Sequence, residues 1–310
     1  MKHFINLKDI PAKDLRKIII DAKKRKSLRK KLSTLEVDKG APLKGKLLIQ
    51  MFEKSSLRTR LSFYLAIKQL GGGTLTLRSN ELHLGQGGES IADTAKILST
   101  YGDGFMLRTD SDKKVENFAK YLSIPVINGL TNRSHPCQVM ADIMTFEEAR
   151  GGIADKRVVW VGDSNNVCLS YIHAATQFGF SLTITSPKEF SPNRDDITLA
   201  RKQGGKIDIL LNPFEAVCDA DLIVTDTYFS MHSEKRYKEE KLHLLRDYQV
   251  NGRLIANAKK DVIFLHCLPA HRGVEVSRDV IDGKNSMVFE AAENRLHVQK
   301  AILAWCVEKQ

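Results

Sequence analysis

Residues 46–70 read KLLIQMFEKSSLRTRLSFYLAIKQL, and this stretch decides the fold class. The apolar run at 46–52 predicts a buried strand, and the apolar spacing over 58–70 predicts a helix. Between the two patterns lie side chains that bind anions: Ser55, Ser56, Arg58, Thr59 and Arg60. A helix start carries unpaired N–H groups and the positive end of the helix dipole, so these side chains favour a phosphate-binding turn. A serine N-cap followed by a surface arginine explains the same letters equally well.

The alternation of strand and helix patterns continues along the chain. Further strand-like runs lie at 73–78, 104–107, 124–127, 157–162, 181–185, 221–226 and 261–267. A long helix pattern at 136–150 ends at two glycines, and an amphipathic pattern occupies 294–308. The sequence therefore predicts an α/β protein with two domains, each a mainly parallel sheet flanked by helices, linked by the 136–150 helix.

Length and composition exclude several classes of protein. The chain has 310 residues, 42% of them hydrophobic, which suits about two domains with sizeable cores. It has no apolar run of the roughly 18 residues that a membrane helix needs. Its first residues lack the apolar stretch of a signal peptide, so we expect a cytoplasmic protein without a membrane partner. The five cysteines form no C-x-x-C pair, which argues against a disulfide framework and a zinc site.

The net charge of +11 favours anionic ligands, either nucleic acids or small molecules. Much of the excess lies at 13–31, where apolar residues keep a helical period and the basic residues fall on the other face. No aromatic residue interleaves with these charges, so bases would have nothing to stack on. A solvated helix face is the favoured interpretation, and no nucleic-acid partner is expected.

The loops that follow the predicted strands carry most of the reactive side chains. Ligands of open parallel sheets bind beyond the carboxyl ends of the strands, so these loops are the expected site. The chain has no G-x-x-x-x-G-K-[ST] sequence, and GDSNN (162–166) is not a G-x-G-x-x-G turn. A small phosphate-bearing molecule therefore fits better than ATP or NAD.

Six motifs resemble those of the aspartate/ornithine carbamoyltransferases, in the same order and over nearly the whole chain. They are SLRTR (56–60), HPCQ (135–138), GDSNN (162–166), DTYFSM (226–231), HCLP (266–269) and AENRLH (292–297). HCLP together with D-x-x-x-S-M is similar to the ornithine branch, and HCLPAHRG is similar to its anabolic members. The resemblance implies transfer of the carbamoyl group of carbamoyl phosphate to L-ornithine, giving L-citrulline and phosphate, without a metal or organic cofactor.

The resemblance also implies a domain division. Residues 1–148 would bind carbamoyl phosphate, joined by a C-terminal helix within 290–310 that returns to this domain. Residues 149–289 would bind ornithine.

The residues that the resemblance assigns to carbamoyl phosphate are Ser56, Leu57, Arg58, Thr59, His83, Arg108, His135, Gln138, Cys267, Leu268 and Arg295. Arg108 and His135 would contact the carbonyl oxygen, which gains charge in the tetrahedral intermediate. Gln138 and the Leu268 carbonyl would hold the carbamoyl amide. Taken singly, Arg108 also suits a surface position and His135 a helix cap. Arg295, expected at the start of the last helix, also suits a pair with a neighbouring glutamate.

The resemblance assigns the amino acid to Asn166, Asp226, Ser230 and Met231. Asp226 would pair with the α-ammonium, assisted by Ser230. The Asn166 amide and the Met231 backbone would bind the α-carboxylate. The simpler interpretations are a turn-forming Asn166 and an N-cap at Asp226.

Cys267 leaves a predicted strand beside these residues. Ornithine attacks only through an unprotonated side-chain amine, so a proton acceptor must lie close, and Cys267 suits a thiolate or proton relay. His266 either tunes Cys267 or is a packed strand histidine. A metal site from His266, Cys267 and His271 is a further alternative, disfavoured because no fourth ligand has suitable spacing. The resemblance implies a cis peptide at Leu268-Pro269.

The segment 80–94 carries His83 and a glycine-rich turn. By itself it suggests a mobile surface turn with a solvated histidine. The resemblance implies instead that His83 reaches the carbamoyl phosphate of a neighbouring subunit in a homotrimer.

Three positions depart from the usual motifs: Leu57, His232 and Ala291. His232 bears most on the choice of amino acid, because glycine is usual there. Two alternatives stay open: a carbamoyltransferase for another amine, such as putrescine or an acylated ornithine, and an inactive basic binding protein on the same fold.

Overall fold

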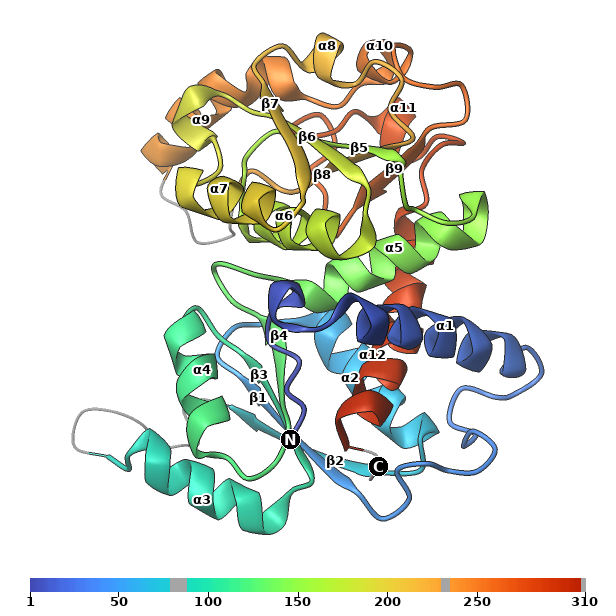
Figure 1. Cartoon of the computed structure of the whole chain (residues 1–310), viewed down its shortest axis with the longest axis vertical. Helices are drawn as coiled ribbons and strands as arrows, with labels where there is room; N and C mark the ends of the chain where they lie inside the picture. The colour runs from blue at the N-terminus through green and yellow to red at the C-terminus, as the bar shows by residue number, and fades with distance from the viewer. Residues whose placement is uncertain (79–87, 230–234, 308–310) are drawn as a thin grey trace. The chain divides into compact units, whose positions relative to one another are not determined.

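The structure, a computed structural model, describes residues 1–78, 88–229 and 235–307 (Figure 1). The chain forms two compact units. Unit 1 comprises Met1–Met144 and Glu293–Gln310, and unit 2 comprises Thr145–Ala292. Helices α5 (Pro136–Arg150) and α12 (Val288–Val307) each contribute residues to both units.

Unit 1 is built on a four-stranded parallel sheet of the described residues, in the order β2-β1-β3-β4. The strands are β1 (Leu47–Phe52), β2 (Gly73–Arg78), β3 (Gly104–Arg108) and β4 (Val126–Leu130). Its helices are α1 (Ala12–Leu28), α2 (Leu57–Gln69), α3 (Ile91–Tyr101) and α4 (Asp112–Tyr121), with the first part of α5 and most of α12. Helices α3 and α4 bury Leu98 and Phe118 against Met51 and Phe105 of the sheet.

Unit 2 is built on a five-stranded parallel sheet of the described residues, in the order β7-β6-β5-β8-β9. The strands are β5 (Arg157–Val161), β6 (Ser181–Thr185), β7 (Lys206–Leu210), β8 (Leu222–Thr225) and β9 (Ile263–His266). Its helices are α6 (Asn166–Phe178), α7 (Arg194–Lys202), α8 (Pro213–Ala216), α9 (Lys235–Leu245), α10 (Gly252–Ile255) and α11 (Arg278–Ile281). The neighbouring strands β5, β8 and β9 are almost wholly buried, as a strand covered on both faces requires.

The predicted fold class is confirmed: the units are parallel sheets with helices, and the 136–150 helix has the expected bounds. One strand was missed. β7 lies at the sheet edge and exposes Lys206, Asp208 and Ile209, so it lacks the continuous apolar run by which the other strands were recognised. Strand β4 begins at Val126 rather than 124, since Pro125 has no N–H to donate to a ladder.

The last helix begins earlier than expected. α12 starts at Val288, because Val288 and Ala291 extend its buried face toward the N-terminus. Arg295 therefore lies about two turns inside the helix, and its expected place at the helix start was wrong. None of the helices in the described ranges is long and apolar enough to cross a membrane.

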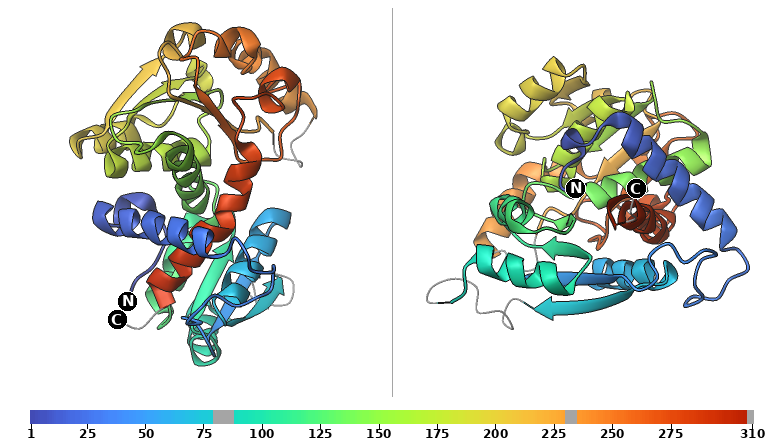
Figure 2. Two further views of the ribbon diagram at one scale, coloured as in Figure 1. Left: turned by 90° about the vertical axis from the view of Figure 1, so that its right-hand side faces the viewer. Right: turned by 60° about the horizontal axis from the view of Figure 1, so that its bottom comes forward.

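Helix α12 is fastened within unit 1 by a buried ion pair. Figure 2 shows α12 running past α1 in this unit. The Lys300 ammonium lies 2.6 Å from Asp38 Oδ2 and donates to Gln69 Oε1 at 3.0 Å. Asp38 also accepts from Arg29 Nη1 at 2.6 Å. The pair thus joins α12 to α2 and to the chain that follows α1.

Lys300 predicts a pH dependence of stability. Burial lowers the pKa of Lys300 to about 8, since it disfavours the charged amine more than Asp38 favours it. Between this pKa and the unfolded value of about 10.4, the unfolded chain holds the extra proton. Lys300 therefore makes the free energy of unfolding rise with pH through this window and fall toward pH 8. Urea melts at pH 8 and pH 10 test this prediction. Between the two pH values, the free energy of unfolding of the wild type should rise relative to that of Lys300→Met. The same pH dependence in both proteins would contradict the prediction.

Candidate active site

The turn between β1 and α2 presents a helix N-terminus at the carboxyl edge of the unit 1 sheet. Ser56 is the N-cap of α2, and its Oγ accepts from the Thr59 N–H at 3.3 Å. The N-cap interpretation is therefore correct for Ser56. The same geometry leaves the first N–H groups of the helix, including that of exposed Leu57, at the turn where an anion is favoured.

Thr59 joins two arginines from distant parts of the sequence. Its buried Oγ1 accepts from Arg295 Nη2 at 2.7 Å and from Arg108 Nη1 at 3.3 Å. Arg108 arrives there because it ends β3 opposite Phe52, the last residue of β1. Two guanidinium groups therefore converge on the first turn of α2.

His135 and Gln138 lie against the same arginine. Arg295 Nη1 donates to Gln138 Oε1 at 2.6 Å and lies 3.3 Å from His135 Nε2. The other end of Gln138 donates to Asp142 at 2.9 Å. Ser56, Arg58, Thr59, Arg108, His135, Gln138 and Arg295 are called the anion cluster below.

The electrostatics of the anion cluster hold His135 neutral. Burial lowers the pKa of His135 well below its ordinary value, and the positive charges of Arg295, Arg108 and Arg58 lower it further. A neutral imidazole still donates through one ring N–H. The anion cluster thus combines fixed positive charge with a neutral donor, which suits a dianionic ligand that also carries a carbonyl oxygen.

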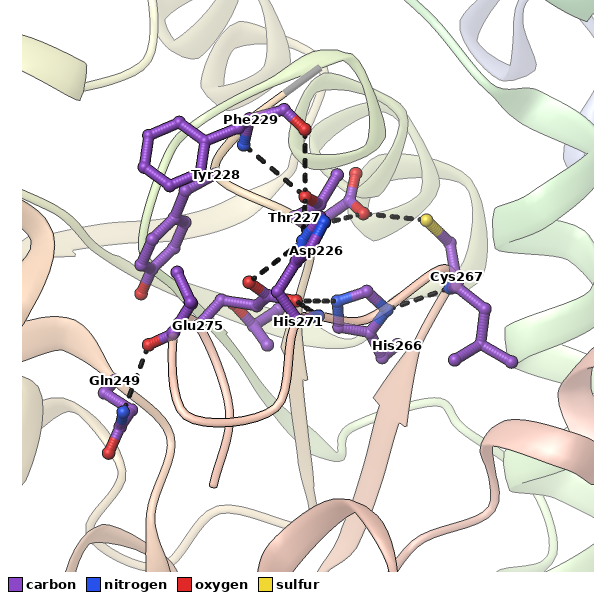
Figure 3. Close-up of polar contacts among 12 residues, drawn as sticks. Asp226, Thr227, Tyr228, Phe229, Gln249, His266, Cys267, His271 and Glu275 are labelled. Carbon is purple, nitrogen blue, oxygen red and sulfur yellow. Dashed lines mark hydrogen bonds and ion pairs between the residues drawn. The ribbon is translucent and has the colours of Figure 1, made fainter. Parts of the chain in front are cut away.

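A second group of polar residues lies at the carboxyl edge of the unit 2 sheet, where β5, β8 and β9 are neighbours (Figure 3). Asp226 Oδ1 accepts from the Thr227 N–H at 2.7 Å and from the Cys267 thiol at 2.8 Å. Its Oδ2 accepts from Asn165 Nδ2 at 2.7 Å. Asn165, Asp226 and Cys267 are called the carboxylate–thiol cluster below. The short thiol–carboxylate contact gives a path along which a proton can move.

Asn165 belongs to this cluster but was not predicted as a site residue, because the sequence motif pointed to Asn166 instead. Asn165 is the N-cap of α6, and its Oδ1 accepts from the Val167 and Cys168 N–H groups at 2.9 and 3.3 Å. Asn166 is the first helical residue. The signal was the N-cap preference of asparagine, but two adjacent asparagines satisfy it equally.

His266 fixes the chain that follows Cys267. His266 Nδ1 accepts from the Leu268 N–H at 2.8 Å, and Nε2 lies 3.4 Å from the fully buried Glu275 carboxylate. These contacts favour the packed strand histidine over a tuner of Cys267. Leu268 has a φ of 57°, and the Leu268-Pro269 peptide is cis, as the resemblance implied.

One donor atom from each of Asp226, His266 and Cys267 lies within 4.8 Å of the others, which is close enough to ask whether they hold a metal. Nδ1 of His266 accepts from a backbone N–H, Nε2 faces Glu275, and the Cys267 thiol donates to Asp226. His271 Nδ1 lies 3.0 Å from Thr227 Oγ1 instead. The arrangement is therefore a hydrogen-bonded network, and no metal is assigned to it.

Four residues singled out in the sequence lie outside the described residues: His83, Ser230, Met231 and His232. Their roles stay predictions. Ala291, the third departure from the motifs, is buried in α12.

The fold and its two clusters define an α/β protein with one unit that suits a phosphate-bearing anion and another that places a carboxylate beside a thiol. Each of the two units also matches a known protein-family domain. Residues 2–148 match the carbamoyl-P binding domain, and residues 154–306 the Asp/Orn binding domain, of aspartate/ornithine carbamoyltransferase. The chain belongs to the aspartate/ornithine carbamoyltransferase family.

Individual relatives agree with this assignment. The chain is 49% identical to the ornithine carbamoyltransferase of Ruegeria pomeroyi and 50% to that of Paracoccus denitrificans, over 99% of each chain. Its fold is similar to the ornithine carbamoyltransferase of Pyrococcus furiosus, with a TM-score of 0.92 and 44% identity over 99% of this chain and 97% of that one. An acetylornithine transcarbamylase complexed with acetylcitrulline is also similar, with a TM-score of 0.84 and 28% identity over 100% of both chains.

Proposed function

We propose that the chain catalyses transfer of the carbamoyl group from carbamoyl phosphate to the side-chain amine of L-ornithine, giving L-citrulline and phosphate, in arginine biosynthesis. The observation that carries the proposal is the convergence of Arg108 and Arg295 on Thr59 beside a neutral His135. The names of the relatives indicate that the acceptor amine is ornithine. Residues 1–148 with 290–310 are the proposed carbamoyl phosphate domain, and residues 149–289 the ornithine domain.

Carbamoyl phosphate is bound by the anion cluster. Ser56, the Leu57 N–H, Arg58 and Thr59 bind the phosphate oxygens at the start of α2, and Arg295 adds positive charge. Arg108 bridges the phosphate and the carbonyl oxygen. His135 donates its neutral N–H to that oxygen as negative charge develops there.

The carbamoyl amide donates to two carbonyl oxygens, those of Gln138 and Leu268. Gln138 Oε1 already accepts from Arg295, but a carbonyl oxygen has a second lone pair. Arg295 therefore also orients the acceptor for the amide.

Ornithine is bound by the carboxylate–thiol cluster and its neighbours. Asp226 pairs with the α-ammonium, assisted by Ser230, and the Asn166 side chain and Met231 backbone bind the α-carboxylate. The amine nitrogen attacks the carbamoyl carbon, a C–N bond forms, and the C–O bond to phosphate breaks. The proton lost by the amine moves to the Cys267 sulfur as the thiol proton moves to Asp226.

Cys267 gives the first test of this step. Cys267→Ala removes the relay, and a positioned proton acceptor contributes roughly 10²–10⁴-fold to rate. We therefore expect kcat to fall by about 10²-fold or more while the Kd of carbamoyl phosphate stays within about twofold. Cys218→Ala, which removes an exposed thiol of the same unit, is the matched control. Near-normal turnover by Cys267→Ala would return this residue to a structural role.

The amine is tested by a panel of substrates with purified protein and carbamoyl phosphate. Ornithine should be carbamoylated in strong preference to putrescine and to Nα-acetylornithine, since Asp226 is matched to a free α-ammonium. Acetylornithine remains the second candidate, because the similar transcarbamylase was solved with acetylcitrulline. A higher kcat/KM for acetylornithine than for ornithine would establish that alternative.

The proposed enzyme is a cytoplasmic homotrimer that needs no metal or organic cofactor, with His83 of one subunit completing the carbamoyl phosphate site of the next. Sedimentation should give the trimer mass, and activity should survive dialysis against EDTA. Mixing His83→Ala with Arg108→Ala under subunit exchange should restore activity, because some interfaces then unite two intact parts. Verified exchange without recovery would reject shared sites.

A further inference from the structure

A buried ion pair in unit 2 lies next to the carboxylate–thiol cluster and has no role in the chemistry above. The Lys241 Nζ of α9 donates to Asp163 Oδ2 at 2.6 Å, with side chains 8% and 17% exposed. The same ammonium lies over the Phe190 ring, 5.0 Å from its centroid. Few lysines are so buried without a reason, because burying an ammonium is costly.

Asp163 is held firmly where β5 passes into α6. Its backbone oxygen accepts from Trp160 Nε1 at 3.0 Å and from the Asn165 N–H at 2.8 Å. Asn165, two residues on, donates to Asp226. The turn from Asp163 to Asn165 therefore contacts Lys241 at one end and Asp226 at the other.

The two carboxylates interact electrostatically. Burial raises the pKa of Asp163, Lys241 opposes this, and the negative charge of Asp226 raises it further. Among the residues that the structure describes, the donors to Asp226 are the neutral groups of Thr227, Cys267 and Asn165. Asp163 is thus paired with a cation, whereas these contacts of Asp226 are hydrogen bonds from neutral donors.

We propose that Lys241 is a charge-compensating, positioning residue of the amino-acid site: by neutralising Asp163 it makes Asp226 the source of the negative charge that the substrate meets. This inference rests on the proposed ornithine carbamoyltransferase function. It concerns the reactive amine, which must lose its proton before it attacks. A second negative charge nearby would favour the protonated amine, and an added positive charge would favour the neutral one.

Among the side chains that the structure describes, the other titratable groups around the pair do not supply this charge. The pKa values of Cys168 on α6 and Tyr228 after β8 are raised by burial, and Asp163 raises both further, so these groups stay neutral near pH 8. Glu275 also raises the pKa of Tyr228, and its carboxylate faces His266 and His271. From β9 the neighbouring group is the Cys267 thiol, which hydrogen-bonds to Asp226.

The test is the pH profile of kcat at saturating substrates, which reports ionisations in the bound complex. Lys241→Met exposes the charge of Asp163, so the acid limb should move up by about one pH unit and kcat on that limb should fall about tenfold. Asp163→Asn leaves Lys241 uncompensated and should move the limb the opposite way. The double variant Asp163→Asn/Lys241→Met removes both charges and should return the limb to its wild-type position.

A matched control is available in the same unit. Lys259 Nζ lies 2.7 Å from Asp221 Oδ1, and Asp221 precedes β8 at the opposite edge of the sheet. Lys259→Met breaks this pair and should leave the profile of kcat unchanged. Thermal melts establish that each variant is folded, and Asp163→Asn still tests the sign of the effect if Lys241→Met does not fold.

A structural brace alone would give the two single variants the same direction of change and would leave the double variant impaired. That result, or a Lys241→Met profile that superimposes on the wild type, would overturn the inference while leaving the proposed function in place. A wild-type protein that forms no citrulline would reject the function and the inference together.

Discussion

Replacing Arg295 with methionine should lower kcat/KM for carbamoyl phosphate by about 10²–10³-fold, the loss that follows removal of one preorganised donor to a developing charge. Arg295 is buried and contacts Thr59, Gln138 and His135. Its loss removes positive charge and also the hydrogen bond that orients the Gln138 carbonyl oxygen. The measurement is steady-state kinetics with ornithine saturating.

The same variant should remain folded. Three guanidinium groups surround His135, so methionine relieves repulsion among like charges and roughly fills the volume of the stem. The midpoint of thermal unfolding should move by only a few degrees, and the added stabilisation by carbamoyl phosphate should largely disappear. Arg25→Met, which removes a guanidinium paired with Asp21 on α1, is the control and should keep full activity. Unchanged kinetics in Arg295→Met would show that the anion cluster is not the carbamoyl phosphate site.

Replacing Asp226 with asparagine should lower kcat/KM for ornithine by roughly 10³-fold, because it removes both the partner of the α-ammonium and the acceptor of the Cys267 proton. Asparagine keeps the shape but not the acceptors. Whichever way its amide turns, its NH₂ group faces a donor, either Asn165 Nδ2 or the Thr227 N–H with the Cys267 thiol. Affinity for carbamoyl phosphate should stay near the wild-type value.

A substrate without the α-amino group separates the two roles of Asp226. 5-Aminopentanoate is ornithine lacking that group, so the wild type should use it poorly, and Asp226→Asn should lose only the part due to proton transfer. Asp221→Asn, at the other end of β8, controls for loss of a carboxylate in this sheet. An equal loss with ornithine and 5-aminopentanoate would show that Asp226 does not bind the α-ammonium.

Local patterns predicted much of the fold, because the buried strands are short apolar runs and most are followed by a helix pattern. Strand β7 escaped since an exposed edge strand such as Lys206–Leu210 buries little. The site residues were found as motifs, but their contacts were not. Thr59 meets Arg108 and Arg295 from 49 and 236 residues away, and Asp163 meets Lys241 from 78 residues away. Such pairings depend on strand order and helix packing, which single-sequence patterns leave undefined.

The central claim is that this chain joins the carbamoyl carbon to the side-chain nitrogen of ornithine. Carbamoyl phosphate labelled with ¹³C at the carbonyl, mixed with ornithine and purified protein, tests it directly by NMR. We predict that the label moves to the ureido carbon of citrulline, one equivalent for each phosphate released, at a rate that depends on ornithine. Phosphate release that is indifferent to ornithine, with the label passing to carbamate or bicarbonate, would contradict the account.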